Sequence, residues 1–324
     1  MINKSHITPF LNQVKDLFSE TFSTAIALLQ VTIPAIIITK ILEELGLVIY
    51  ISRGLEPIMG LMGLPGSLGL VWATGIFTTP LSAMAVFAAL APGLDLSAAQ
   101  VTVVCSILLI AHSLPIEMSI SKRAGAGLLP IGALRLFGAL AYGMILHWIC
   151  SSTGLWQEPA QLLFSVEPGD KTLAQWSLTQ LHNLGLIIVI IFCIMSIMRL
   201  LRGIGFLSLL ERGLKPVLPF FGMTHRAAPV TVVGMILGIA YGGALIIKET
   251  TTGAMNRRDI FSSLALMSLS HGLIEDTLLM MAIGGKLGGI LWGRLIFSLA
   301  VLYVLARIMD VMHRQRNNIE DNNI

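Results

Sequence analysis

Three ionisable residues lie close together in an apolar part of the sequence. His271, Glu275 and Asp276 fall near the middle of a run that begins after Arg258 and ends near Ile283, about long enough to cross a bilayer. Charged side chains at that depth cost roughly 2.5–3.5 kcal/mol each on insertion scales, so by default they mark a path for an ion or solute. The structural alternative is that each bridges two helices, for about 1 kcal/mol or less. Three such residues so close together favour function.

These residue types suit the movement of protons, cations or polar solutes. On one continuous helix, His271 and Glu275 share a face because they are four residues apart, whereas Asp276 lies about 100° further round, so the two acids cannot point the same way. Adjacent carboxylates in a low dielectric resist ionising together, and a histidine beside them can hold a proton or donate a hydrogen bond. Proton or cation coupling and hydrogen bonding to a polar solute both remain open.

The same pattern occurs twice in the chain. A shift of 159 residues aligns, without a gap, Arg53 with Arg212, Pro57 with Pro216, His112 with His271, and Arg135 with Arg294. It also places Glu117 opposite Asp276, so each half carries a histidine and, five residues later, an acid. An internal repeat of this kind fixes the architecture, and the sequence therefore predicts two copies of one module.

Composition excludes most soluble classes. The chain has 324 residues, of which 55% are hydrophobic and 12% charged, and its mean hydropathy is +0.83. Soluble domains carry about 25% charged residues, so this is a polytopic membrane protein. The net charge of +3 is spread over loop ends, so no nucleic-acid partner is expected. Cys105, Cys150 and Cys193 share no metal spacing, and we expect no metal site and no cofactor. His271 and Glu275 form His-x-x-x-Glu and not His-Glu-x-x-His, and the chain has no Gly-x-Ser-x-Gly, so we expect no enzymatic activity.

Two interrupted apolar segments decide the topology. Segments 66–92 and 226–253 contain helix-breaking residues, among them Gly75, Pro80 and Gly238. If both segments are kinked full spans, the main basic clusters face outward, against the positive-inside rule. If both are re-entrant hairpins, each half has three spans, the second half is inverted, and those clusters and both termini are cytoplasmic. The second interpretation is favoured, although kinked spans stay open.

We therefore expect an all-α polytopic membrane protein of two inverted-topology repeats. Each repeat has three transmembrane helices, an interfacial helix and a re-entrant helical hairpin. The expected parts are an N-terminal amphipathic helix over 1–21, the first repeat over 22–149, an external polar linker over 150–180, the second repeat over 181–308 and a disordered polar tail over 309–324.

Several motifs resemble the nucleoside-recognition, or Gate-domain, membrane protein family. They are Gly-Ile-Ala-Tyr-Gly-Gly-Ala-Leu-Ile-Ile-Lys-Glu (238–249), Asn-Arg-Arg-Asp (256–259), His-Gly-Leu-Ile-Glu-Asp-Thr (271–277), Thr-Gly-Ile-Phe-Thr-Thr-Pro-Leu (74–81) and His-Ser-Leu-Pro-Ile-Glu (112–117). The resemblance covers about 25 to 308 as two modules and implies a membrane permease. Related modules occur in ferrous iron transporter B and, more distantly, in concentrative nucleoside transporters. The chain has no Gly-x-x-x-x-Gly-Lys-Ser/Thr, so nucleotide-driven transport is not expected.

The expected binding residues lie at mid-span positions and at the helix breaks: His112, Glu117, His271, Glu275, Asp276, Thr78, Thr79, Tyr241, Lys248, Glu249 and Thr250. Arg135 and Arg294 are the expected counter-ions, with snorkelling to the interface as the alternative. The threonines could instead bond their own helix backbone, and Lys248 could simply pair with Glu249.

The leading hypothesis is a multi-pass permease of a bacterial or archaeal inner membrane, proton- or cation-coupled, for a small polar or ionic, nucleoside-like solute. A non-transporting protein of envelope assembly, or of a larger membrane complex, is the alternative. The expected partners are the solute or ion and the lipid bilayer, and homo-oligomerisation is left open.

Overall fold

The computed structural model describes residues 36–162, 172–221, 223–251 and 255–321, together with positions 19, 26, 29, 30, 33 and 34. The described part is built from helices, with one isolated β-bridge between Ser97 and Pro159. The helix expected over 1–21 falls outside the described residues apart from Ser19. Of the span expected over 22–43, residues 36–43 are continuously described, and they are helical.

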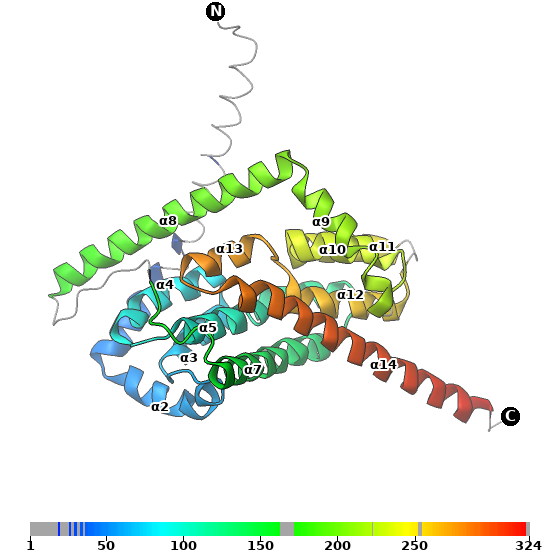
Figure 1. Cartoon of the computed structure of the whole chain (residues 1–324), viewed down its shortest axis with the longest axis horizontal. Coiled ribbons are helices and arrows are strands. Elements are labelled where there is room, and N and C mark those ends of the chain that lie inside the picture. Colours follow the sequence, from blue (N-terminus) through cyan, green and yellow to red (C-terminus); the bar gives the residue numbers. More distant parts are fainter. Residues whose placement is uncertain are drawn as a thin grey trace, which may run out of the picture.

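The helices follow one another in two similar series (Figure 1). The first series is α2 (Leu47–Gly60), α3 (Leu68–Phe77), α4 (Pro80–Leu90), α5 (Ala98–Ile110), α6 (Leu114–Arg123) and α7 (Leu128–Thr153). The second is α8 (Leu173–Gly203), α9 (Phe206–Leu214), α10 (Ala227–Leu237), α11 (Ile239–Thr251), α12 (Arg257–Ser270), α13 (Glu275–Ala282) and α14 (Arg294–Asp321). Short non-α turns cover Ala91–Gly93, Leu218–Phe221 and Gly288–Gly293.

Five stretches of the described chain are long and apolar enough to cross a membrane. They are Ala98–Arg123, Leu128–Thr153, Leu173–Gly203, Arg257–Ala282 and Gly288–Val311. The first and fourth each contain a break between two helices, α5 with α6 and α12 with α13. The expected spans over 97–121, 126–148, 181–201, 259–283 and 287–308 each overlap one of these stretches.

Each interrupted segment forms two short helices that pack against each other, α3 with α4 and α10 with α11. The first break lies at Thr78 and Thr79, where the Thr79 hydroxyl accepts from the Ser82 amide at 3.2 Å and caps α4. The second lies at Gly238, whose φ of 99° is in the left-handed region that glycine tolerates. A Cβ on Gly234 would lie 2.9 Å from the Gly242 Cα, so α10 and α11 approach closely.

Two boundaries differ from the sequence-based expectation. Helix α8 begins at Leu173 within the expected linker, because Thr172 and Gln175 form a capping box that starts a helix there. Helix α14 continues to Asp321, where a disordered tail is expected. Neither glycine nor proline occurs between Gly293 and Asp321, so nothing in the local sequence stops the helix.

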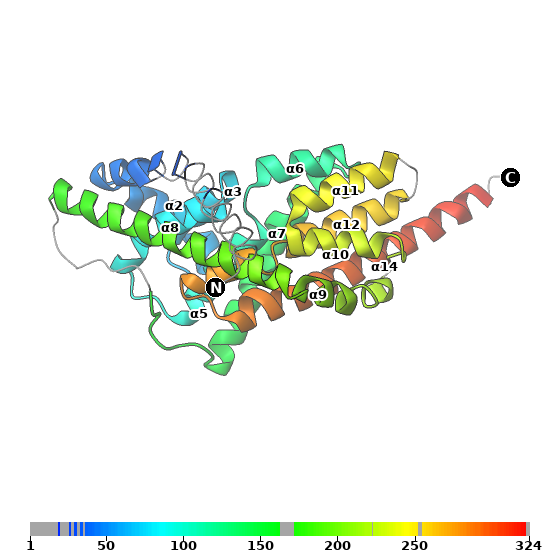
Figure 2. The same cartoon turned by 90° about the horizontal axis from the view of Figure 1, so that it is seen from above.

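The helices form two hydrophobic cores, and each core includes elements of both series. One core combines α3, α4, α5 and α7 with α8 and α13, although α8 and α13 belong to the second series. The other combines α10, α11, α12 and α14 with residues 124–131 of the first series, and α6 packs against α11 beside it. Figures 1 and 2 show α2 and α3 toward one end of the molecule and α9 to α11 toward the other. Helices α5, α7 and α12 contact one another between the two ends.

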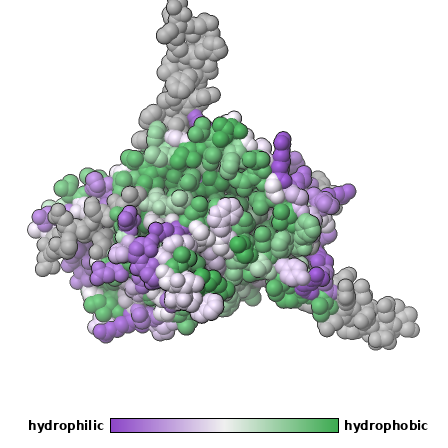
Figure 3. Space-filling model, in the orientation of Figure 1, coloured by the Kyte–Doolittle hydropathy of each residue, from purple (hydrophilic) through white to green (hydrophobic). Residues whose placement is uncertain are grey.

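The outer surface of the long helices is apolar. Figure 3 shows a broad hydrophobic area along the line of α8. Large side chains more than half exposed on α7, α8 and α14 include Phe137, Trp148, Val189, Leu200, Ile296 and Val304. A soluble monomer rarely exposes so much contiguous apolar surface, whereas lipid tails cover it without cost.

Candidate functional site

The break between α5 and α6 is held against the break between α3 and α4. Ser113, with a φ of 48°, ends the first half of the span. Its amide donates to the Gly75 carbonyl at 2.9 Å, and its hydroxyl donates to the Thr78 carbonyl at 2.5 Å. Pro115 follows in the first turn of α6, where its missing N–H costs nothing. Two discontinuities therefore meet, which concentrates free backbone groups at one place.

The break between α12 and α13 is also bonded to a short helix, here α10. Helix α12 ends at Ser270, and Gly272 has a φ of 60°. The Leu273 amide donates to the Met235 carbonyl in α10 at 3.0 Å. Non-helical backbone at membrane depth is tolerated only when protein buries it or when it lines a water-filled cavity.

This break corrects the prediction of a continuous helix through His271, Glu275 and Asp276. His271 caps the end of α12, and Glu275 begins α13, so the two side chains do not share a helix face. Both acids instead line one cavity, which the continuous helix excluded. The cause is Gly272, whose left-handed conformation ends α12 and restarts the chain in a new direction. At the start of α13 the acids also lie where free backbone N–H groups favour negative charge.

Two histidines from the two halves of the chain meet at the breaks. The His112 Nε2 and His271 Nε2 atoms are 3.0 Å apart. The Glu117 Oε1 atom lies 3.4 Å from the first and 3.3 Å from the second. All three side chains are buried, with His112 and His271 3% exposed and Glu117 7% exposed. The structure thus brings together three of the predicted site residues, from α6 and from the two broken ends.

Arg135 binds this cluster from α7. Its guanidinium pairs with Glu117 Oε2 and donates to the carbonyls of Ile110 at 2.8 Å and His112 at 2.9 Å. The side chain is fully buried. It therefore neutralises the acid and satisfies two carbonyls that the end of α5 leaves free.

Arg294, in the corresponding position of α14, is bonded differently. It is also fully buried, but none of its three guanidinium nitrogens has a hydrogen-bond partner among the described residues. Asp276 and Tyr142 are its electrostatic neighbours, and the Tyr142 hydroxyl is engaged with the Gly289 carbonyl at 2.6 Å. Each guanidinium nitrogen of Arg135 thus has a hydrogen-bond partner, whereas Arg294 interacts with the charge of Asp276 without a hydrogen bond to it.

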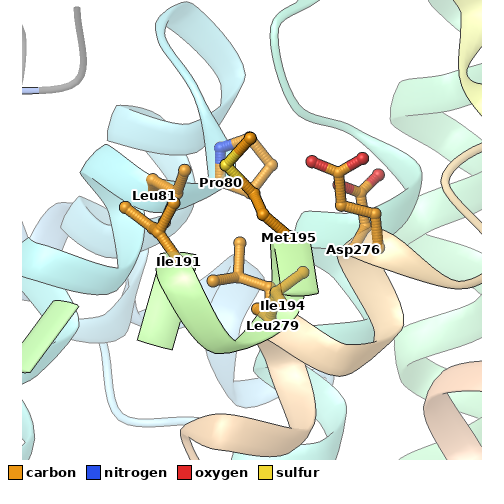
Figure 4. Close-up of a pocket in the computed structure, with 8 residues that line it drawn as sticks. Pro80, Leu81, Ile191, Ile194, Met195, Asp276 and Leu279 are labelled. Atoms are coloured by element: carbon orange, nitrogen blue, oxygen red, sulfur yellow. The ribbon is translucent and has the colours of Figure 1, made fainter. Parts of the chain in front are cut away.

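A cavity of about 120 Å³ is lined by Asp276, which interacts electrostatically with His271 and Arg294. Figure 4 shows the Asp276 carboxylate at its edge, with Pro80 and Met195 across the opening. The lining comes from the start of α4 (Pro80, Leu81), from α8 (Ile191, Ile194, Met195) and from α13 (Glu275, Asp276, Leu279). Since one water needs only about 10–15 Å³ by this kind of measure, the space holds several waters or a small solute. Drug-sized ligands usually occupy about 300–1,000 Å³.

The predicted threonines bond their own helices. Thr78 donates to the Thr74 carbonyl at 2.5 Å, Thr250 donates to the Ile246 carbonyl at 2.7 Å, and Thr79 caps α4. These bonds match the structural alternative considered for them. Their part in binding a solute stays a prediction.

The other predicted residues on α11 are not part of the histidine cluster or the lining of this cavity. Lys248 is exposed and Glu249 half-buried, and each interacts with a neighbouring group. Tyr241 lies in α11, and its side chain is outside the described part of the structure.

Sequence reasoning missed Ser113 and the α8 residues that line the cavity. Ser113 aligns with Gly272 under the 159-residue shift, and both have positive φ, so the repeat carried a usable signal. Ile191, Ile194 and Met195 gave none, because they lie in the apolar part of α8, whose packing partners are distant in sequence.

Several apolar helices of membrane-spanning length, with buried charges at their centre, define a multi-pass integral membrane protein. Its sequence is 27% identical over 271 residues to the uncharacterized membrane protein YvoD of Bacillus subtilis, across 81% of this chain and 84% of that protein. No protein-family model matches the sequence. No solved structure matches it either.

Proposed function

We propose that the protein is a transporter for a small polar or ionic solute, coupled to a proton or another cation. One observation carries the proposal: buried ionisable side chains from both halves of the chain converge where two apolar spans are broken, and Asp276, which interacts electrostatically with His271, lines a small cavity. His112, Glu117 and His271 form the centre of this group. Buried charges in spans are costly and typically mark ion or solute paths.

The proposal includes two inverted repeats, each with a re-entrant hairpin, α3–α4 and α10–α11. It is supported by contacts that recur at positions 159 apart. Gly75 and Gly234 approach Ala83 and Gly242 in the partner short helix, and they lie against Leu108 and Met267. The histidine Nδ1 atoms bond the carbonyls of the same two residues, Leu108 and Met267. Positive φ values recur at Gly46 and Gly205, Ser113 and Gly272, and Gly125 and Gly284.

Alternating access requires that equivalent parts of the two repeats adopt different states. In the proposed repeat, α4 corresponds to α11 and α13 to α6. Helix α11 packs directly on α6, whereas the cavity separates residues of α4 from the acids of α13. Glu117 is bonded to Arg135, whereas Arg294 has no bond to Asp276 among the described residues. The interface between α11 and α6 thus resembles a closed gate, and the equivalent interface between α4 and α13 resembles an open one.

The solute we propose is an ion or a very small polar molecule, because the cavity is smaller than a typical ligand pocket. The resemblance to the Gate-domain family fits a permease, but a cavity of this size does not support a nucleoside as the solute. We place both termini in the cytoplasm of a bacterial or archaeal cell on the positive-inside rule.

Reconstitution tests the proposal. The purified full-length protein in liposomes is expected to give counterflow of a labelled solute from a panel of nucleosides, divalent metal ions and small organic acids. Asp276→Asn is expected to abolish or uncouple that flux while the protein remains folded, because the acid lines the cavity. Glu158→Gln, at an exposed acid of the expected linker that pairs with Lys286 outside this cavity, is the matched control and should transport normally. Folded protein without flux across the panel would favour a role in envelope assembly.

A further inference from the structure

The cluster of His112, Glu117 and His271 has the features of a metal site. Each residue offers one ligand atom, and the three atoms lie together in the interior. His112 lies in the break between α5 and α6, Glu117 lies in the first turn of α6, and His271 lies in the break after α12. A ligand bound here would touch both halves of the chain at once.

The hydrogen bonds of the two rings fix where their protons are. The His112 Nδ1 atom is 2.8 Å from the Leu108 carbonyl, and the His271 Nδ1 atom is 2.9 Å from the Met267 carbonyl. A carbonyl oxygen can only accept, so both Nδ1 atoms carry a hydrogen and donate it. In neutral rings both Nε2 atoms are then left with lone pairs. Histidines that bind metals are oriented by the same kind of bond from the other ring nitrogen.

Three acceptor atoms therefore face one another without a hydrogen between them. The two Nε2 atoms are 3.0 Å apart, and Glu117 Oε1 lies 3.3 and 3.4 Å from them. Lone pairs at these distances repel unless a cation lies among them. A single proton can join only two of the three atoms, whereas a metal ion can bond to all three.

The spacing fits a first-row transition metal. Zinc binds histidine nitrogen and carboxylate oxygen at about 2.0–2.2 Å, which separates neighbouring ligands of a tetrahedron by roughly 3.3 Å. The three measured separations lie close to that value. Two histidines and one carboxylate with an open position are also a donor set that such divalent ions use. Arg135 occupies only the Oε2 atom of Glu117, so Oε1 is free to bind.

We infer that His112, Glu117 and His271 bind one divalent first-row transition metal ion, of the Zn²⁺ type, between the two halves of the protein. Arg135 would orient the Glu117 carboxylate as a supporting partner, and a water or solute would take the fourth position. Asp276, which interacts electrostatically with both His271 and Glu117, would help to balance the added charge. The inference stands whether or not the protein transports a solute.

Metal binding to the full-length protein in detergent tests the inference without any flux assay. After treatment with a chelator, Co²⁺ is expected to bind at one ion per chain with the visible absorption of a four-coordinate site, and Zn²⁺ is expected to displace it. His112→Gln and His271→Gln should each weaken binding by at least about 100-fold, because loss of a ligand exceeds the 10–100-fold cost of losing a supporting partner. His182→Gln and His225→Gln, at exposed histidines, should bind as the wild type does.

X-ray absorption of the Zn²⁺-loaded wild type gives a second readout that needs no variant. Two imidazole nitrogens and at least one oxygen in the first coordination sphere are expected. Unchanged affinity in both cluster variants would overturn the inference, because the metal would be bound elsewhere. Absence of stoichiometric binding to folded wild-type protein would also overturn it and would leave a shared proton between the two rings.

Discussion

Glu117 and Asp276 occupy corresponding positions, yet their neutral variants should differ strongly in stability. Glu117 is 7% exposed and pairs with Arg135, which is fully buried. Removing one partner of a buried ion pair costs about 3–5 kcal/mol, because the other charge is left uncompensated. Asp276 is half-buried and has no hydrogen bond to lose among the described residues. Asp276→Asn leaves Arg294 without its acidic neighbour but breaks no hydrogen bond in the described part of the chain, so it should cost less than Glu117→Gln.

Thermal unfolding in detergent measures the difference. A thiol-reactive dye can report unfolding, because Cys105 and Cys150 are buried and Cys193 supplies only a constant background. Glu117→Gln should lower Tm by roughly 6–10 °C, since proteins of this size shift by about 2 °C per kcal/mol. Asp276→Asn should lower it by less than Glu117→Gln does.

A double variant separates the ion pair from the rest of the site. Glu117→Gln combined with Arg135→Gln removes both charges, so it should lose less stability than the sum of the losses of the two single variants. Equal losses in Glu117→Gln and Asp276→Asn, or a loss in the double variant equal to the sum of the two single losses, would refute the reasoning.

Two further predictions test the architecture. Cysteines placed at Asp95 and Arg257 should react with an impermeant thiol reagent from opposite sides of the membrane, and reaction from one side only would exclude inverted halves. Gly234→Ala should destabilise by about 1–3 kcal/mol, because the added methyl meets the α11 backbone. Gly185→Ala in α8, where the methyl enters open space, should be neutral or stabilising by up to about 1 kcal/mol, and similar unfolding of the two variants would count against the close packing of α10 and α11.

Much of the helical framework could be predicted from the sequence. Apolar runs of spanning length are a strong signal, and Thr78 to Pro80 and Gly238 mark breaks that the structure contains. The break after His271 could not be recognised with the same ease. Gly272 is a lone glycine in an apolar run, and such a residue is often tolerated within a helix. Only its alignment with Ser113, just before Pro115, pointed to a break.

The candidate site was predictable in its residues but not in its geometry. The repeat identified His112 and His271 as equivalent, and equivalent residues of two inverted copies meet only if they lie near the axis that relates the copies. The sequence does not show how far each histidine lies from that axis. The contribution of α8 to the cavity depends on packing between distant segments, so hydropathy alone could not reveal it.

The central claim is that two oppositely oriented halves bring their ionisable residues together at mid-depth in the bilayer. An electron cryomicroscopy map of the full-length protein in lipid nanodiscs measures this directly. We predict that α3–α4 and α10–α11 enter from opposite faces and that His112 and His271 meet near the bilayer centre. Entry of both helix pairs from one face, or histidines separated toward lipid or water, would contradict it.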